Sequence, residues 1–188
     1  MPVLRMFYRR HLPHWQKADS ALFITWRLHG SLPRRVIDAC RKESDFGKRF
    51  LMLDRELDRS VFGPTWLKDV RLARIVSDSL TYAEEHLRFY RLAAYVVMSN
   101  HVHILIWPRA YMSRITKSIK GYTARECNKL LARTGENFWQ DESFDHSVRN
   151  ENEFWRIKRY IELNPVKAGL VTRPEEWAWS SATVLELP

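Results

Sequence analysis

The chain has 188 residues, 45% of them hydrophobic and eight of them tryptophan, which is enough for the core of a single domain over residues 1–188. Its 31 Lys and Arg residues outnumber its 22 Asp and Glu residues, and the formal charge of +9 favours a polyanionic partner such as nucleic acid. The sequence has no run of roughly 20 apolar residues and no signal peptide at its start, so we expect a cytoplasmic protein with no membrane partner. Cys40 and Cys127 lie far apart in helix-like segments, which favours reduced thiols over a disulfide.

The first third of the chain combines a strand and a helix with two irregular segments. Residues 1–19 are rich in basic and aromatic side chains without a clear period, and we expect them to form a basic N-terminal arm. Residues 21–28 alternate apolar and polar side chains, which predicts a half-buried strand, and a helix follows from Pro33 to about Lys42. Residues 43–67 are charged and irregular, so we predict a loop-rich insertion with room for a short helix.

A helix and a hairpin come next. Asp69 is a suitable N-cap for a helix that runs to about His86, with apolar residues at helical spacing. Residues 90–98 and 101–107 then predict two strands, and the connection between them is short enough for a hairpin.

The last part of the chain contains two more helices. A long helix begins near Ser113, and a short strand is expected toward the end of residues 137–149. Asn150, with Glu153 three residues later, resembles a capping box and starts a final helix that Pro165 must end. The order of the elements predicts an α+β fold in which helices cover a central antiparallel sheet.

Two histidines mark the second strand of the hairpin. His101 and His103 are two residues apart in a segment rich in Val, Ile and Leu, and strand side chains alternate between faces, so both imidazoles point to the same side. Neutral imidazole is a common metal ligand, but two imidazoles do not complete a metal site. A bare His-x-His pattern is also frequent in ordinary strands, so a third ligand is needed to support metal binding.

The final helix offers two candidates for this site. Tyr160 and Asn164 are four residues apart, so they lie one turn apart along one border of the buried stripe. From there a phenol and a carboxamide can point into a cleft. On the residues alone, Tyr160 also fits an ordinary tyrosine at the core edge, and Asn164 also fits a helix C-cap before Pro165.

Several segments together resemble a known family. Residues 95–105 resemble the metal-binding strand of the HUH transposases, and residues 160–170 resemble their single-tyrosine helix. Taken with three further segments, the chain resembles the REP-associated tyrosine transposases, of the single-tyrosine IS200-like group, over nearly its whole length. The further segments are residues 10–15, 139–140 and 177–181.

The resemblance implies a ferredoxin-like HUH core, with His101 and His103 as ligands of a divalent ion, Mg²⁺ or Mn²⁺. It also implies Tyr160 as the nucleophile and Asn164 as the third ligand, where related transposases often carry the longer Gln. The implied activity is transposase-type cleavage and rejoining of single-stranded or hairpin DNA, such as bacterial REP elements, through a 5′-phosphotyrosine. Such a protein would work in the bacterial cytoplasm and associate with the nucleoid. No residue of the sequence is identifiable as a general base.

Basic residues on three segments are candidates for holding the DNA. They lie on the arm, on the long helix and before the last helix: Arg9, Arg10, Arg114, Lys117, Lys120, Arg125 and Arg149. His146 fits a DNA contact, a proton carrier or a buried hydrogen-bonded histidine, and we favour the last. We expect a monomer because no segment resembles a dimerisation helix, although related transposases include dimers.

Two other functions stay open on the residues alone. A basic ferredoxin-like module that binds DNA or RNA without cleaving it, such as a domesticated repressor, fits the charge and would use the histidines structurally. A cupin-type metal enzyme also uses His-x-His, but it would need a glutamate soon after the second histidine and many glycines, and the chain has only six glycines.

Overall fold

The structure, a computed structural model, describes residues 6–9, 13–16 and 20–183. Its centre is a four-stranded antiparallel sheet with the strand order β4-β5-β3-β6. The strands are β3 (Leu22–Arg27), β4 (Tyr90–Val97), β5 (His101–Pro108) and β6 (Phe144–Ser147).

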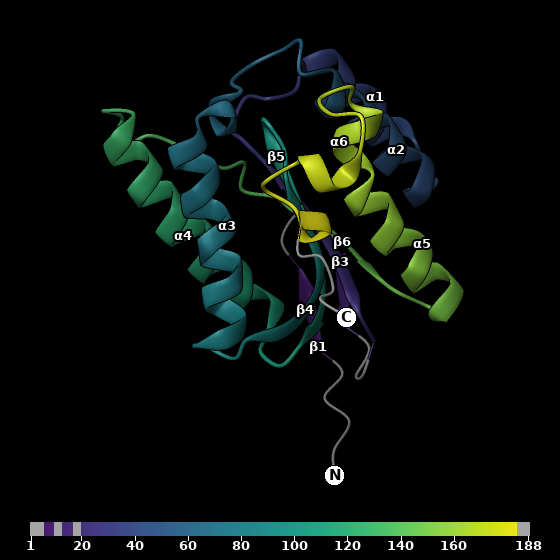
Figure 1. The fold of residues 1–188 in the computed structure, drawn as a ribbon. Coiled ribbons are helices and arrows are strands. Elements are labelled where there is room, and N and C mark those ends of the chain that lie inside the picture. Colours follow the sequence, from purple (N-terminus) through teal and green to yellow (C-terminus); the bar gives the residue numbers. More distant parts are fainter. Residues whose placement is uncertain (1–5, 10–12, 17–19, 184–188) are drawn as a thin grey trace.

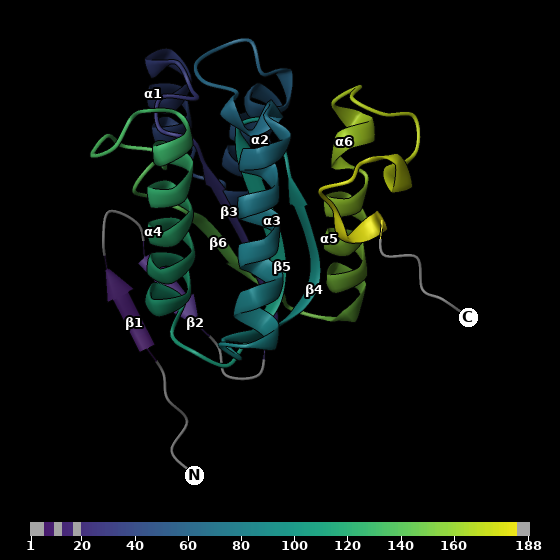
Figure 2. The same ribbon diagram turned by 60° about the vertical axis from the view of Figure 1, so that its left-hand side comes forward.

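Helices cover both faces of this sheet (Figure 1). On one face α3 (Val70–Glu85) and α4 (Met112–Leu130) pack side by side, as Figure 2 shows. On the other face lies α5 (Glu151–Glu162). The chain order β3-α3-β4-β5-α4-β6, with this strand order, is the ferredoxin-like arrangement. The predicted α+β fold with a helix-covered antiparallel sheet is therefore confirmed.

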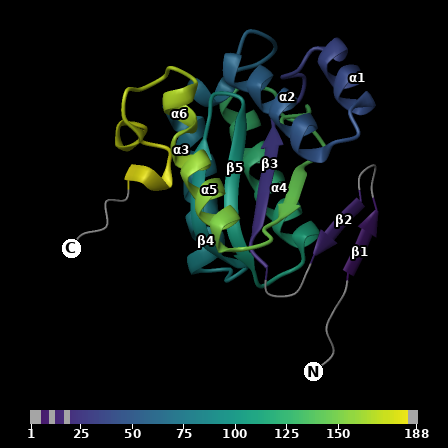
Figure 3. The ribbon, with the colours of Figure 1, turned by 90° about the vertical axis from the view of Figure 1, so that its right-hand side faces the viewer.

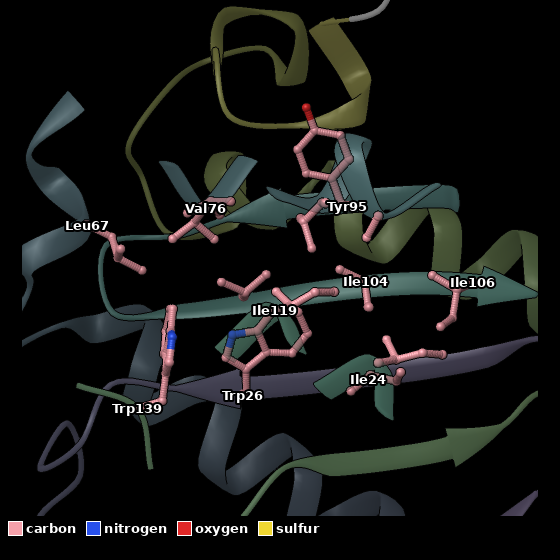
Figure 4. Close-up of a cluster of buried hydrophobic side chains, with 14 of the residues drawn as sticks. Ile24, Trp26, Leu67, Val76, Tyr95, Ile104, Ile106, Ile119 and Trp139 are labelled. Carbon is pink, nitrogen blue, oxygen red and sulfur yellow. The ribbon is translucent and has the colours of Figure 1, made fainter. Parts of the chain in front are cut away.

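The alternation of side chains along β3 and β5 separates the two faces. Ile24, Trp26, Ile104 and Ile106 point toward α3 and α4 and form a dense apolar core with residues of those helices (Figure 4). The side chains between them point toward α5. The apolar residues that pack on that face are Phe23, Leu105, Phe154 and Ile161.

Residues 43–67 are not loop-rich, and that prediction was wrong. After α1 (Arg34–Lys42), the segment contains α2 (Phe46–Arg59), a helix of 14 residues, followed by the short 3-10 helix η1 (Trp66–Lys68). Asp45 caps α2 by accepting a hydrogen bond of 2.8 Å from the backbone N–H of Lys48. Of the charged residues that obscure the helical pattern, Lys48, Arg55 and Arg59 are exposed on α2, whereas Asp54 is buried.

The N-terminal arm and the C-terminal part of the chain each contain elements that the sequence did not predict. The arm includes a two-stranded antiparallel sheet of β1 (Met6–Arg9) and β2 (Pro13–Gln16), beside the main sheet in Figure 3. At the other end, Asn150 caps α5 as predicted, accepting from the N–H of Glu153 at 2.9 Å. The chain then continues into the short α6 (Asn164–Lys167).

Two 3-10 helices, η2 (Pro174–Glu176) and η3 (Ser181–Thr183), follow α6. Among the described helices, none is long and apolar enough to cross a membrane.

Candidate active site

His101 and His103 lie side by side at the start of β5, on the α5 face of the sheet. Both side chains are fully buried, and their Nε2 atoms are 3.1 Å apart. The Nδ1 atom of His103 is 2.7 Å from the hydroxyl of Thr25 on β3, and Nδ1 of His101 is 2.7 Å from Oδ1 of Asn100. Each imidazole is thus held through Nδ1, which leaves both Nε2 atoms directed at the same point.

The hydrogen bonds of Asn100 fix the tautomer of His101. The amide nitrogen of Asn100 donates to the carbonyl of Leu57 at 3.1 Å, so its oxygen faces His101 and accepts the Nδ1 hydrogen. Burial, together with the neighbouring His103, lowers the pKa of His101 to about 3. His101 is therefore neutral at physiological pH and presents an Nε2 lone pair, as a metal ligand must.

Two aspartates on α2 complete a polar cluster with the histidines. Oδ1 of Asp54 lies 3.0 Å from Nε2 of His103 and 3.9 Å from Nε2 of His101, and Oδ1 of Asp58 lies 3.7 Å from Nε2 of His101. Neither Oδ1 atom has a hydrogen-bond partner among the described residues. The donor atoms of Asp54, His101 and His103 lie within 4.8 Å of one another, so these three residues could hold a divalent ion.

The electrostatics of the two aspartates differ. Burial disfavours the charged form of Asp54, but the adjacent His103 and His101 and the nearby Lys167 outweigh it and lower the pKa of Asp54. Burial and the Asp54 carboxylate raise the pKa of Asp58 to about 7. Asp54 is therefore the carboxylate that is charged at neutral pH and able to balance a cation.

The sequence did give one signal for Asp54. Phe50, Leu53, Asp54 and Leu57 recur at the spacing of one helix face. An acidic residue within such an apolar stripe is buried when the helix forms, and a buried acid needs a partner. Once residues 43–67 are interpreted as loop, this signal is lost.

Tyr160 on α5 reaches the same cluster. Its hydroxyl donates a hydrogen bond to Oδ2 of Asp54, and its ring lies 5.8 Å from the ring of His103 between centroids. The ammonium of Lys167, a residue that did not stand out in the sequence, lies 4.1 Å from the centre of the Tyr160 ring. The structure thus brings together a phenol, a carboxylate, two imidazoles and a cation.

Asn164 does not act as a helix cap. Its side chain is fully buried, and neither its oxygen nor its nitrogen has a hydrogen-bond partner among the described residues. The C-cap of α5 is Leu163 instead, through its backbone. Burying a carboxamide without hydrogen-bond partners destabilises the fold unless a bound group from outside the protein supplies them.

A family model describes this part of the chain. The model of the IS200-like transposases matches residues 71–164, which is half of the 188 residues. The chain belongs to the IS200-like transposase family. The match includes His101, His103, Tyr160 and Asn164, whereas α2 with Asp54 lies outside it.

Two individual proteins resemble this transposase. The REP-associated tyrosine transposase of Escherichia coli (strain K12) is 29% identical over 134 residues, which are 63% of this chain and 76% of that protein. The solved structure of a REP-associated tyrosine transposase bound to a REP hairpin aligns with a TM-score of 0.58 at 20% identity, covering 93% of this chain and 81% of the other. The structural likeness shows that the two share a fold.

Membership of this family distinguishes between the functions that were compatible with the sequence alone. Its members are tyrosine transposases, which cleave and rejoin DNA strands, so this transposase is an enzyme and not a non-catalytic module. The cupin alternative is wrong because the sheet is ferredoxin-like.

The candidate DNA-binding residues fall in different places. Arg114, Lys117, Lys120 and Arg125 lie on α4, which covers the face of the sheet opposite to Tyr160 (Figure 1). Lys120 donates to the backbone carbonyls of Gln140 at 2.6 Å and Asp141 at 2.9 Å, and Arg125 pairs with Glu126 at 2.8 Å.

The remaining candidates lie elsewhere in the chain. Arg149 is exposed just before α5, Arg9 is in β1, and Arg10 lies outside the described residues. His146 is paired with Glu153 at 3.2 Å, as expected of a hydrogen-bonded histidine.

Proposed function

We propose that this transposase cleaves and rejoins single-stranded or hairpin DNA of the REP type through a covalent 5′-phosphotyrosine at Tyr160. The observation that carries this proposal is the hydrogen bond from Tyr160 to Asp54, because the other oxygen of this carboxylate lies 3.0 Å from Nε2 of His103. The REP hairpin bound to the structurally similar transposase supports the class of substrate. We further propose a monomer that acts on nucleoid DNA in the bacterial cytoplasm.

His101, His103 and Asp54 would hold the divalent ion, with Asn164 as a further ligand. Two converging Nε2 atoms, an unpartnered carboxylate oxygen and an unpartnered buried carboxamide fit Mg²⁺ or Mn²⁺, whose ligands are mostly oxygen with some imidazole. A bound ion would withdraw charge from the scissile phosphate and orient it.

The residues of the chain perform the other tasks. Asp54 Oδ2 holds the Tyr160 hydroxyl in place by accepting its hydrogen bond, and Lys167 adds positive charge beside the ring where the phosphate arrives. Tyr160 gives up its proton through the Asp54 carboxylate that accepts its hydrogen bond, and its oxygen forms a bond to phosphorus as the bond from phosphorus to the 3′ oxygen breaks. The departing oxygen takes up a proton and becomes a 3′-hydroxyl. A second 3′-hydroxyl reverses the reaction and rejoins the strand.

A covalent-trapping experiment tests the proposal. The protein is incubated with Mn²⁺ and a pool of hairpin oligonucleotides that are labelled at the 3′ end and carry a randomised single-stranded flank, and the products are separated on a denaturing gel. We expect a labelled protein band with wild type and none with Tyr160→Phe. Tyr82→Phe serves as the matched control, because Tyr82 is 53% exposed on α3.

Two results would count against the proposal. One is an adduct that persists in Tyr160→Phe, which would assign the nucleophile to another residue. The other is a wild-type protein that binds the oligonucleotides but forms no adduct in the presence of Mn²⁺.

A further inference from the structure

A cavity of about 470 Å³ lies next to the candidate active site. It is bounded by β3, α1, α2 and the segment that leads into β6. Of these elements, Figure 3 labels β3, α2 and α1, with α1 at the upper right. Its volume falls in the range of about 300–1,000 Å³ that ligand pockets occupy. Four arginines line it: Arg27, Arg34, Arg41 and Arg49.

The cavity is continuous with the reactive centre. Thr25 and Arg27 line it from β3, and across the sheet they pair with His103 and His101 of β5. Asp54 also belongs to its wall. A ligand bound in the cavity would therefore lie beside Asp54 and Thr25, and so near the phosphate that Tyr160 attacks.

Arg27 and Arg49 carry positive charge that the protein leaves unbalanced. Arg27 is largely buried, and its guanidinium has only the carbonyl of Leu28 at 3.5 Å and the hydroxyl of Ser31 at 3.3 Å as partners among the described residues. Arg49, which is partly buried, has no ion pair within the described part of the chain; its guanidinium lies 5.5 Å from the centre of the Phe46 ring and close enough to Cys40 to act on that thiol electrostatically. A guanidinium taken out of water without a carboxylate is costly, so such a group indicates a site for an external anion.

The other charges of the cavity do not cancel this excess. Arg34 and Arg41 share one carboxylate, that of Asp38, at 3.4 Å and 3.5 Å. The lining contains two acidic residues, Asp54 and Glu142, and the carboxylate of Asp54 faces the histidines. The cavity thus remains cationic.

Aromatic rings form the side of the cavity nearest to the reactive centre. The centroid of the Phe50 ring lies 4.6 Å from that of Phe144, and both line the cavity. The same Phe50 ring lies 6.1 Å from His103 and 6.0 Å from Tyr160. Unpaired bases stack on such rings, and phosphates bind guanidinium groups, so rings and cations together match a nucleotide.

We propose that this cavity binds one unpaired nucleotide of the substrate DNA strand, next to the scissile phosphate, with its phosphate on Arg27 and Arg49 and its base against Phe50 and Phe144. The proposal rests on the proposed function, since it assumes a DNA strand at Tyr160. It places contacts with the single strand on α1, α2 and β3, in addition to the arm, the long helix and Arg149 that the sequence suggested. The elements α1, α2 and β3 lie outside the matched family region.

Binding measurements in the cleavage-deficient Tyr160→Phe background test the pocket without the reaction. The probe is the same labelled hairpin pool with a randomised flank, followed by fluorescence anisotropy over a range of salt concentrations. We expect Arg49→Gln to weaken binding by about tenfold and to reduce the salt slope by about one, as for the loss of one phosphate contact. Arg74→Gln, an exposed arginine on α3, is the matched control and should bind like the background protein.

Arg27→Gln and Phe50→Leu extend the test, with thermal melts to confirm folding. Arg49 is only partly buried and forms no ion pair among the described residues, so Arg49→Gln should fold and keeps the test decisive if Arg27→Gln and Phe50→Leu unfold. Unchanged affinity and salt slope in Arg49→Gln, or losses equal to those in Arg74→Gln, would overturn the proposal. A wild type that binds through Arg49 but forms no covalent adduct would instead contradict the catalytic function and leave the pocket in place.

A crosslinking arm distinguishes a nucleotide of the strand from an incidental phosphate. A photoreactive 4-thiothymidine placed beside the cleaved phosphate should crosslink to the peptides that contain Phe50 or Phe144. Free mononucleotide and inorganic phosphate should compete only weakly. Crosslinks confined to α4 would favour the opposite face as the path of the strand and would contradict the proposal.

Discussion

The two faces of the central sheet use the same strands for different purposes. On the α3 and α4 side, Ile24 and Ile104 lie in an apolar core with 0% exposure. On the α5 side, their neighbours in the chain, Thr25 and His103, form a buried hydrogen bond of 2.7 Å. Because adjacent residues of a strand point to opposite faces of the sheet, one face can hold the apolar core while the other holds the reactive residues.

The two faces also differ in how many buried polar atoms lower the stability of the fold. The α3 and α4 face is mainly apolar, with the indole N–H of Trp26 as a buried group without a partner among the described residues, whereas the α5 face buries His101, His103, Asp54 and Asn164, several of whose atoms have no hydrogen-bond partner among the described residues. Such atoms destabilise a fold until something binds them. Substitutions on the two faces should therefore have separable effects on stability and on reaction.

The largest effect is expected from His103→Ala. Loss of a ligand at the reacting phosphate should reduce the cleavage rate by on the order of 10³-fold or more, while DNA affinity changes little because it is spread over many cations. Single-turnover cleavage and anisotropy measured on the same preparation check this. Equal losses of cleavage and binding would show that the two roles are not separate.

Ile104→Ala tests the opposite face. Removing this buried side chain should lower the free energy of unfolding by about 2–5 kcal/mol, with the cleavage rate per folded molecule nearly unchanged below the melting transition. Urea unfolding and cleavage assays provide the measurements. If the variant stayed as stable as wild type, the apolar face would not be the main source of stability.

Thr25→Val should weaken metal binding. The change keeps the shape of the side chain but removes the hydrogen bond to Nδ1 of His103, and the loss of such a supporting contact weakens metal binding by about 10–100-fold. Titration calorimetry with Mn²⁺ measures it, and Thr25→Ser is the control that restores the hydroxyl. Equal Mn²⁺ affinity in all three proteins would contradict a supporting role for Thr25.

The smallest effect is expected at the start of α5. Asn150→Ala removes the side-chain cap and should cost about 1 kcal/mol of stability, whereas Asn152→Ala, exposed in the first turn, should cost little. Thermal melts of both variants give the comparison. A similar melting temperature for the two would mean that the cap does not hold the helix that carries Tyr160.

The parts of this structure that follow from local patterns could be predicted from the sequence. The alternation in β5, the hairpin and the cap at Asn150 each depend on neighbouring residues, and so did the placement of His101 and His103 on one side of a strand. The apolar stripe around Asp54 indicated its burial, but its contact with His103 could not be predicted, because the two residues meet only through the packing of α2 against the sheet.

The candidate DNA contacts show the same limit. Basic residues on α4 look suitable along the sequence, but only the fold reveals that α4 covers the face opposite to Tyr160 and that Lys120 is held by backbone carbonyls. Arg27 gave no sequence signal, since a single arginine at the end of a strand is ordinary until its burial is known.

The central claim is that the α5 face holds a divalent ion beside Tyr160. A crystal soaked with Mn²⁺ and measured at a wavelength where manganese scatters anomalously tests this most directly. We predict one strong peak bonded to Nε2 of His101, Nε2 of His103 and Oδ1 of Asp54, and no peak there in His101→Ala. A peak elsewhere on the molecule, or one that persists at this position without His101, would contradict the account.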